Sequence, residues 1–309
     1  MTEVLVIRLG ALGDFILSAG PFAAIRARHP DARITLLTTK PFAALAQAAP
    51  WFDRVWIDTR PKLWNLPGLL ALRRRLRQGR FDFVYDLQTS SRSSWYFHLM
   101  GGAPFWSGIA KGCSHPDSNP DRCHIHTLER QAIQLRLAGI ETVPPPDFSW
   151  VTVDIDSFDL KSPYALLCPG GAPHRPAKRW PHENFAELAR DLAAKGLRPV
   201  VLGTDAERAE CDAIARACPD ALNLCSRTDL FQISKLAQGA KVAVGNDTGP
   251  MHLIAASLCP SVVLFSNESD PKRCAPRGAT PRSVTVIQVP DLRDLAPDRV
   301  IQAAAVASA

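Results

Sequence analysis

The stretch KVAVGNDTGPMHLIAASL, residues 241–258, decides the fold, because a strand pattern passes there directly into a helix pattern. Its first part is a short apolar run that is typical of a buried strand, and its last part is an apolar helix pattern. The same alternation recurs along the whole chain. Strands that alternate with helices at this interval predict parallel sheets joined by right-handed crossovers.

The turn inside this stretch has the residues of an anion site. Asp247 ends the expected strand, Thr248 and Gly249 form the turn, and Pro250 stands where the first turn of a helix tolerates proline. The N–H groups of such a turn lie at the positive end of the helix dipole, so we expect an anion to bind there. His252 either donates to that anion or fills the interface, and its spacing fits both.

Two α/β domains are expected. In the first half, the expected strands are residues 3–10, 32–39, 54–58 and 81–88, and the expected helices are 14–30, 41–50, 66–79, 93–102 and 126–140. In the second half, the expected strands are residues 164–170, 198–204, 221–226, 241–247 and 261–266, and the expected helices are 182–196, 205–218, 230–240 and 249–258. A proline-rich and acidic linker lies between them. The prediction is therefore two Rossmann-like domains, residues 1–155 and 156–309, facing each other across a cleft.

Composition agrees with an ordinary globular protein. The 309 residues are 46% hydrophobic and 21% charged. The N-terminus lacks the basic and apolar regions of a signal peptide, and about 18 consecutive uncharged apolar residues occur nowhere. We therefore expect a cytoplasmic protein with reduced cysteines. The Cys113–His126 segment contains two cysteines and three histidines, but their spacing fits no common zinc site and predicts a plain loop.

Two more loops at expected strand ends have unusual residues. In RLGALGD, residues 8–14, the glycines permit a tight turn, and Asp14 is either a helix cap or a catalytic carboxylate. In the loop after the first strand of the second half, Gly170 and Gly171 precede several cations, among them Lys178. Backbone N–H groups and a lysine suit a diphosphate.

A cationic patch lies in the first half of the chain. It consists of Lys62 and the run RRRLRQGR, residues 73–80, within a formal net charge of +6. Such a patch attracts phosphates of a nucleic acid, an anionic lipid or an acidic saccharide. No zinc-finger, RNA-binding or zipper pattern accompanies it, which disfavours nucleic acid.

Four blocks of the sequence, in this order, resemble the ADP-heptose:lipopolysaccharide heptosyltransferases, glycosyltransferase family nine. The blocks are RLGALGD (8–14), KRWPHENFAEL (178–188), NDTGPMHLIAA (246–256) and VVLFSNESDPKRCAPRG (262–278). The resemblance covers nearly the whole chain. It implies the glycosyltransferase-B fold, with the acceptor bound by the N-terminal domain and the nucleotide sugar by the C-terminal domain.

The resemblance also implies roles for single residues. Asp14 matches the acid that is thought to be the catalytic base. The donor-binding positions are Gly170, Gly171, Lys178, Glu207, Asp247, Thr248, Gly249 and His252. Lys178 would contact the diphosphate, and Glu207 looks like the ribose-binding acid. Part of the basic patch, together with Arg92, would then orient the acceptor: the expected binding residues are Lys62, Arg73, Arg74, Arg75 and Arg92.

The implied reaction is an inverting transfer of heptose from ADP-heptose to a hydroxyl of the lipopolysaccharide inner core. No cofactor or metal is required, although magnesium is an alternative counter-ion for the diphosphate. The expected partners are the nucleotide sugar and the core acceptor, and no nucleic acid. Trp64 and the apolar run LPGLL beside the basic patch suggest a peripheral contact with the cytoplasmic face of the inner membrane. Asn267 and Glu268 depart from the family pattern, so a different donor sugar stays open.

Two other functions fit parts of the sequence. A non-catalytic nucleotide-sugar-binding protein would keep the C-terminal loops and have no need of Asp14. A dinucleotide-dependent oxidoreductase would use similar domains, but the chain lacks the G-x-G-x-x-G pattern and the acid after the second strand.

Overall fold

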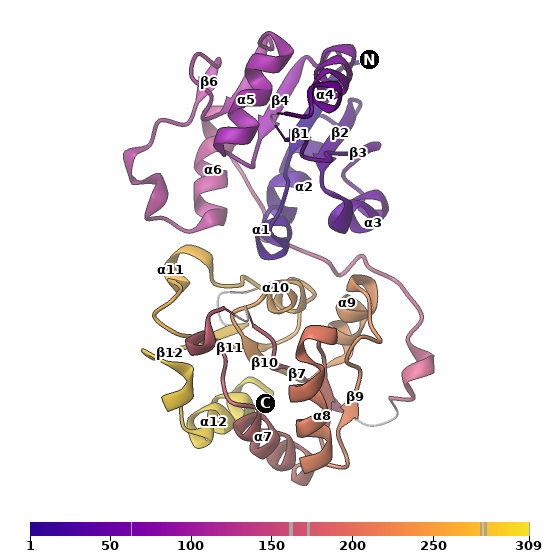
Figure 1. Cartoon of the computed structure of the whole chain (residues 1–309), viewed down its shortest axis with the longest axis vertical. Helices are drawn as coiled ribbons and strands as arrows, with labels where there is room; N and C mark the ends of the chain where they lie inside the picture. The colour runs from indigo at the N-terminus through magenta and orange to yellow at the C-terminus, as the bar shows by residue number, and fades with distance from the viewer. Residues whose placement is uncertain (63, 161–162, 172–173, 279, 281–282, 309) are drawn as a thin grey trace. The chain divides into compact units, whose positions relative to one another are not determined.

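The computed structural model describes every residue of the chain except 63, 161–162, 172–173, 279, 281–282 and 309. The described chain divides into two compact units, Met1–Pro144 and Pro145–Ala309. Each unit contains a six-stranded parallel sheet with helices on both faces (Figure 1). The predicted α/β class is confirmed.

The first unit has the strand order β3-β2-β1-β4-β5-β6. Its strands are β1 Glu3–Ile7, β2 Arg33–Thr38, β3 Arg54–Ile57, β4 Phe83–Asp86, β5 Phe105–Gly108 and β6 His115–Pro116. Its helices are α1 Leu12–Leu17, α2 Ala19–Arg28, α3 Lys40–Ala48, α4 Leu66–Gln78, α5 Ser91–Met100, the 3₁₀ turn η1 Pro120–Cys123 and α6 Thr127–Leu137. Helices α1, α2 and α6 pack together, and α4 packs against α5.

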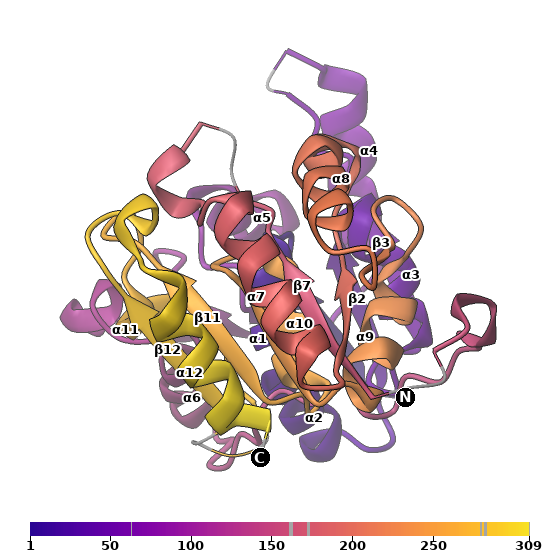
Figure 2. The same ribbon diagram turned by 90° about the horizontal axis from the view of Figure 1, so that it is seen from below.

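The second unit has the strand order β12-β11-β10-β7-β8-β9. Its strands are β7 Tyr164–Cys168, β8 Arg198–Val201, β9 Leu222–Asn223, β10 Val242–Asn246, β11 Ser261–Phe265 and β12 Val284–Gln288. Its helices are α7 His182–Ala194, α8 Arg208–Ala217, α9 Leu230–Gly239, α10 Gly249–Ala256, α11 Pro271–Cys274 and α12 Pro297–Ser308. Its 3₁₀ turns are η2 Asp156–Phe158, η3 Pro176–Lys178, η4 Asp205–Glu207 and η5 Leu292–Asp294. Helices α7, α8 and α12 cover one face, and α9 and α10 cover the other (Figures 1 and 2).

The central strands are continuous apolar runs because both faces of a parallel sheet are covered. Val4, Leu5 and Val6 of β1 are completely buried, as are Val242 and Val244 of β10. In both sheets the winding direction reverses between the two central strands, β1 and β4 in the first and β7 and β10 in the second. Ligands of such sheets bind outside the carboxyl ends of the strands at this reversal.

The first expected helix, residues 14–30, is wrong as a single helix. The chain forms α1 and α2 instead, with Ser18 as the residue between them. Pro21 explains the interruption, because proline has no N–H for a bond to Leu17 and is tolerated only in a first helical turn. Asp14 lies in the first turn of α1, because that helix begins at Leu12.

The division between the units falls at Pro144 and Pro145, whereas the expected boundary was 155/156. The intervening segment packs on the second unit. The N–H of Phe148 donates to Ala256 O at 2.8 Å, and the amide of Gln238 donates to Val151 O at 3.0 Å. The proline-rich and acidic pattern therefore locates the segment between the two units, but it does not show that the segment packs on the second unit.

Within the described residues, no helix is both long enough and apolar enough to cross a membrane. All eight cysteines are free thiols. Five of the six that are buried, Cys168, Cys211, Cys218, Cys225 and Cys259, lie in the second unit, and three of these belong to its main apolar core.

Candidate active site

Strands β7 and β10 end beside each other and lead into the two loops that contain most of the expected donor residues. Asn246, the last residue of β10, joins these loops. Its side-chain amide donates to the carbonyl oxygens of Pro169 at 2.8 Å and Gly170 at 3.0 Å, and its Oδ1 accepts from the backbone N–H of Trp180 at 3.2 Å. Asn246 is fully buried, so these bonds fix the loops in a place sheltered from water. The prediction missed Asn246, although its position directly before Asp247 at a buried strand end was a usable signal.

Lys178 and Asp247 meet between these loops. Nζ of Lys178 lies 2.6 Å from Oδ2 of Asp247, and the two side chains are only 12% and 10% exposed. The hydroxyl of Ser269, which the prediction also missed, donates to the same carboxylate oxygen at 2.7 Å. An ammonium group has three donors, so the bond to Asp247 leaves Lys178 able to contact an anion. The carboxylate of Asp247 therefore orients Lys178 and leaves further N–H donors of the ammonium group available.

Helix α10 begins at the same place. Thr248 is its N-cap residue and makes no side-chain capping hydrogen bond, and Pro250 occupies the first turn as expected. The positive end of the helix dipole is therefore directed at the loop of Asp247. The His252 ring is buried in this turn, 6% exposed. An anion beside Gly249 would be stabilised by both the helix and Lys178.

Gly245 sets how closely α10 approaches the sheet. A Cβ atom at this position would lie 2.6 Å from Cβ of Cys168 and 2.7 Å from Sδ of Met251. Both distances are far shorter than van der Waals contact, so only glycine allows β7, β10 and the start of α10 to pack in this way. The close packing at Gly245 thereby places the start of α10, with Thr248 and Gly249, directly at the ends of β7 and β10.

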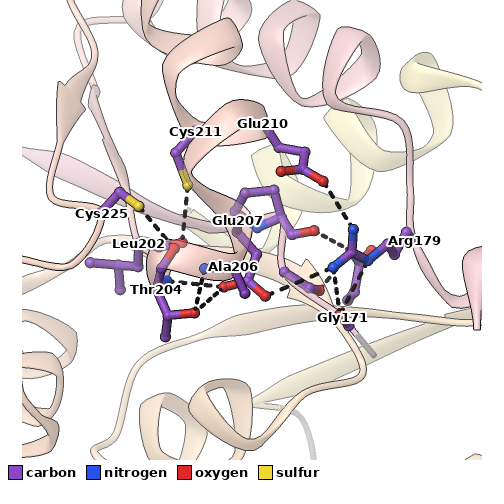
Figure 3. Close-up of polar contacts among 12 residues, drawn as sticks. Gly171, Arg179, Leu202, Thr204, Ala206, Glu207, Glu210, Cys211 and Cys225 are labelled. Atoms are coloured by element: carbon purple, nitrogen blue, oxygen red, sulfur yellow. Dashed lines mark hydrogen bonds and ion pairs between the residues drawn. The ribbon is translucent and has the colours of Figure 1, made fainter. Parts of the chain in front are cut away.

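Glu207 lies on the neighbouring loop, after β8 (Figure 3). Its Oε2 accepts from the Thr204 N–H at 3.0 Å and the Thr204 hydroxyl at 2.6 Å, so it closes the capping box of η4. Arg179 donates to Gly171 O at 2.7 Å and lies 2.9 Å from Glu210 Oε1 and 3.8 Å from Glu207 Oε1. Arg179 thus ties the glycine loop after β7 to the loop that contains Glu207. The structure brings Glu207 to this group of loops but gives it a structural role as well.

In the first unit, the loops after β1 and β4 meet around Arg8. The Arg8 side chain is 2% exposed, donates from Nη1 to Leu87 O at 2.6 Å, and places Nη2 3.2 Å from Oδ1 of Asp14. Burial lowers the pKa of the Arg8 guanidinium, while the Asp14 carboxylate acts in the opposite direction. The Asp14 side chain is 40% exposed. Asp14 is therefore held by a buried cation and is still open to a substrate.

An open pocket of about 720 Å³ adjoins this loop. Its walls come from the ends of β1, β2 and β3, with the residues Leu9, Gly10, Ala11, Thr39, Lys40, Pro41, Phe42, Ile57, Asp58, Thr59 and Arg60. Arg60 donates to Leu9 O at 2.6 Å and so joins the loop after β3 to the loop before Asp14. The prediction missed Lys40 and Arg60, because only the order of the strands shows that their loops lie side by side.

The structure divides the expected acceptor residues. Lys62 lies over the Trp64 ring, with Nζ 4.9 Å from its centre. Arg92 donates to the Tyr96 hydroxyl at 3.2 Å, and Arg75 lies over the Trp56 ring at 4.5 Å. The other two residues, Arg73 and Arg74, lie on α4 in a separate hollow that shares no residue with the pocket at the strand ends.

Asp86, at the end of β4, gives a pH dependence to stability. Burial raises the pKa of its carboxyl from 3.8 to about 6. The protonated form is therefore favoured by folding, and this contribution is present below pH 3.8 and is lost as the pH rises through about 6. We expect Asp86→Asn, which is neutral throughout, to lack this loss. Urea unfolding of both proteins across this pH range tests it, and parallel curves would contradict the assignment.

The residues of the Cys113–His126 segment have contacts of other kinds. The His115 ring stacks on Phe105 with 3.9 Å between ring centres, and His126 accepts from the Leu128 N–H at 3.2 Å. Among the residues that the structure describes, no three His, Cys, Asp or Glu side chains are grouped as metal ligands would be.

Comparison with known proteins gives one consistent family. The family model described as glycosyltransferase family 9 (heptosyltransferase) matches residues 69–299. Lipooligosaccharide heptosyltransferase 2 of Haemophilus influenzae is 34% identical over 300 residues, which cover 86% of this chain and 84% of that protein.

Two solved structures from Escherichia coli have the same fold. ADP-heptose lps heptosyltransferase II has a TM-score of 0.81 and 24% identity, with 99% of this chain and 98% of that chain covered. Heptosyltransferase WaaC with ADP-2-deoxy-2-fluoro heptose has a TM-score of 0.77 and 20% identity, with 97% and 98% covered. The likeness confirms the expected fold class, two Rossmann-like α/β units of the glycosyltransferase-B type.

Proposed function

Because the chain belongs to glycosyltransferase family 9 (heptosyltransferase), we propose that it transfers heptose from ADP-heptose to a hydroxyl of the lipopolysaccharide inner core. The observation that carries the proposal is the Lys178–Asp247 pair at the reversal between β7 and β10, beside the start of α10. A lysine and a helix N-terminus at one point form a site for a diphosphate. The two Escherichia coli structures support the choice of donor, because one is described as an ADP-heptose lps heptosyltransferase and the other contains ADP-2-deoxy-2-fluoro heptose.

The second unit would bind the donor. The diphosphate would lie between Lys178 and the first turn of α10, which includes Thr248, Gly249 and His252. Gly170 and Gly171 would let the backbone approach it. Glu207, one carboxylate oxygen of which is engaged by Thr204, would accept from the ribose hydroxyls with the other.

The first unit would bind the acceptor and supply the base. Asp14 would take the proton from the acceptor hydroxyl while that oxygen attacks the anomeric carbon on the face opposite the nucleotide, which inverts the configuration. The diphosphate leaves with the electrons of the broken bond. Lys178 and the α10 dipole would stabilise its growing charge, so neither a general acid nor a resident metal is needed. Magnesium would act only as an additional counter-ion.

Charged groups of the acceptor would meet the cations near the pocket at the strand ends. Lys62 and Arg92 stay proposed for this role, and Lys40 and Arg60 join them because they line the pocket beside the Asp14 loop. Phosphates and carboxylates of a core oligosaccharide suit such cations. An acceptor with a lipid anchor would keep the enzyme at the cytoplasmic face of the inner membrane.

Calorimetry with a panel of nucleotide sugars tests the donor. We expect the wild-type chain to bind ADP-heptose in preference to other ADP-, UDP- and GDP-sugars, and Lys178→Ala to weaken that binding. Preferential binding of another sugar nucleotide would keep the transferase and replace heptose, in line with the departures at Asn267 and Glu268. Binding of none would contradict the proposed function.

A further inference from the structure

Helix α4 has one face that packs and one that does not. Leu72 and Leu76 are buried in the apolar core of the first unit. On the exposed side, Leu66 and Leu70 are 65% and 62% exposed, and Trp64, just before the helix, is 77% exposed. Large apolar side chains gathered on a surface in this way mark a contact with an apolar partner.

The same face continues into cations. Leu66 and Leu70 are followed at helical spacing by Arg73 and Arg77, so these four side chains form one stripe along α4. A hollow of about 430 Å³ at its C-terminal end is lined by Leu70, Arg73, Arg74, Arg77, Gln78 and Arg80. Arg75 points elsewhere, over the Trp56 ring. Within the described chain, no carboxylate forms an ion pair with the arginines that line this hollow.

We propose that this α4 face, Trp64 to Arg80, docks the protein on the surface of an anionic phospholipid bilayer. The arginines would contact headgroup phosphates, and Trp64, Leu66 and Leu70 would enter the boundary between headgroups and acyl chains. Lys62, with its ammonium over the Trp64 ring, would lie at the same level. The positive charge of the arginines favours an anionic partner. The apolar half of the stripe favours a partner with a hydrocarbon region, which a lipid bilayer has.

A nucleic acid fits this face less well. Single strands are bound by cations interleaved with aromatic rings on which bases stack. Here the apolar half offers two leucines and a single tryptophan, and the arginines are grouped beyond them. The biological role of this docking rests on the proposed function: a lipid-anchored acceptor would lie at the membrane surface that α4 contacts.

Co-sedimentation of the full chain with vesicles tests the docking surface. We expect binding to vesicles of phosphatidylcholine with phosphatidylglycerol, and little binding to phosphatidylcholine alone. Arg77→Gln/Arg80→Gln should lower the vesicle partition about 25-fold, at roughly fivefold for each arginine. Leu66→Ser/Leu70→Ser should lower it too, and added salt should weaken the arginine effect but not the leucine effect.

The matched control is Arg190→Gln/Arg216→Gln, which removes the same charge from exposed positions of the second unit and should bind like wild type. If the control lost vesicle binding equally, the effect would depend on net charge and not on the α4 face, and the proposal would be overturned. Unchanged vesicle binding by both α4 variants, or binding to single-stranded RNA that only the arginine variant loses, would also overturn it.

Transfer to a water-soluble acceptor separates the two proposals. Arg77→Gln/Arg80→Gln should transfer normally to such an acceptor and lose rate only when the acceptor is in vesicles. Vesicle binding needs neither donor nor acceptor. A wild-type chain that binds anionic vesicles through α4 but transfers nothing would refute the proposed function alone, and a transferase indifferent to vesicles would refute the docking surface alone.

Discussion

The Asp14→Asn protein is expected to bind ADP-heptose like wild type and to transfer heptose about 10³-fold more slowly. Asparagine keeps the size of the side chain but cannot take the proton of the attacking hydroxyl. The donor residues lie in the other unit, so donor affinity should not change. The measurement is kcat for transfer, together with the calorimetric Kd of ADP-heptose for the same preparation.

Asp53→Asn is the matched control for this loss. Asp53 is also a carboxylate of the first unit paired with an arginine, since it lies 2.5 Å from Nη2 of Arg26, and its side chain is 46% exposed against 40% for Asp14. Asp53 also accepts from the Ile34 N–H, so the control should lose stability and keep kcat. A kcat for Asp14→Asn within a few-fold of wild type would remove Asp14 as the base.

Lys178→Ala is expected to lower kcat/KM about 10²- to 10³-fold, because the lysine would stabilise the diphosphate both on binding and on departure. The change also leaves the Asp247 carboxylate, 10% exposed, with the Ser269 hydroxyl as its one side-chain partner among the described residues and with its charge facing the diphosphate. Donor affinity by calorimetry and steady-state kinetics would both report this loss. Lys195→Ala is the control, since Lys195 pairs with Asp191 on the surface of the same unit.

The double variant Lys178→Ala/Asp247→Ala tests how the pair works. If Asp247 acts by orienting Lys178, removing both should cost little more than removing the lysine alone, because the two effects are coupled. Losses that multiply would instead give Asp247 an independent contact with the donor. Lys178→Ala kinetics equal to those of Lys195→Ala would contradict the diphosphate site itself.

The sequence predicted the parts of the site that depend on local pattern. An apolar strand followed by glycine, a charged residue and a helix is visible in a few residues, and the structure places Asp14, Lys178 and Asp247 in the segments that follow β1, β7 and β10. Parallel sheets bring such loops to one edge. The loops after β7 and β10 could therefore be expected to meet before their register was known.

What the sequence did not predict depends on distant contacts. Lys40 and Arg60 are single cations in separate loops, and only the strand order makes them neighbours. Asn246 and Ser269 resemble ordinary polar residues until their partners are seen. The position of Arg75 was predictable in part, because residues buried at Leu72 and Leu76 set the helix face and place Arg75 away from the exposed stripe.

Three strands and the last helix were missed for a different reason. Strands β5, β6 and β12 lie at or next to sheet edges, and β12 is exposed at Thr285, Val286 and Gln288. An edge strand lacks the continuous apolar run, bounded by turn residues, that marks a buried strand in the sequence. Helix α12 is rich in alanine, whose weak hydrophobic contrast gives little periodicity, although Val300 and Ala304 are buried in the core.

The most direct test of the proposed reaction is the anomeric configuration of the product. The wild-type chain would be incubated with ADP-heptose and a lipopolysaccharide core that lacks heptose, and the product examined by NMR. We expect one added heptose whose anomeric configuration is opposite to that of the donor, and about 10³-fold slower formation of that product with Asp14→Asn. A product that keeps the donor configuration, or no transfer of heptose by the wild-type chain, would contradict it.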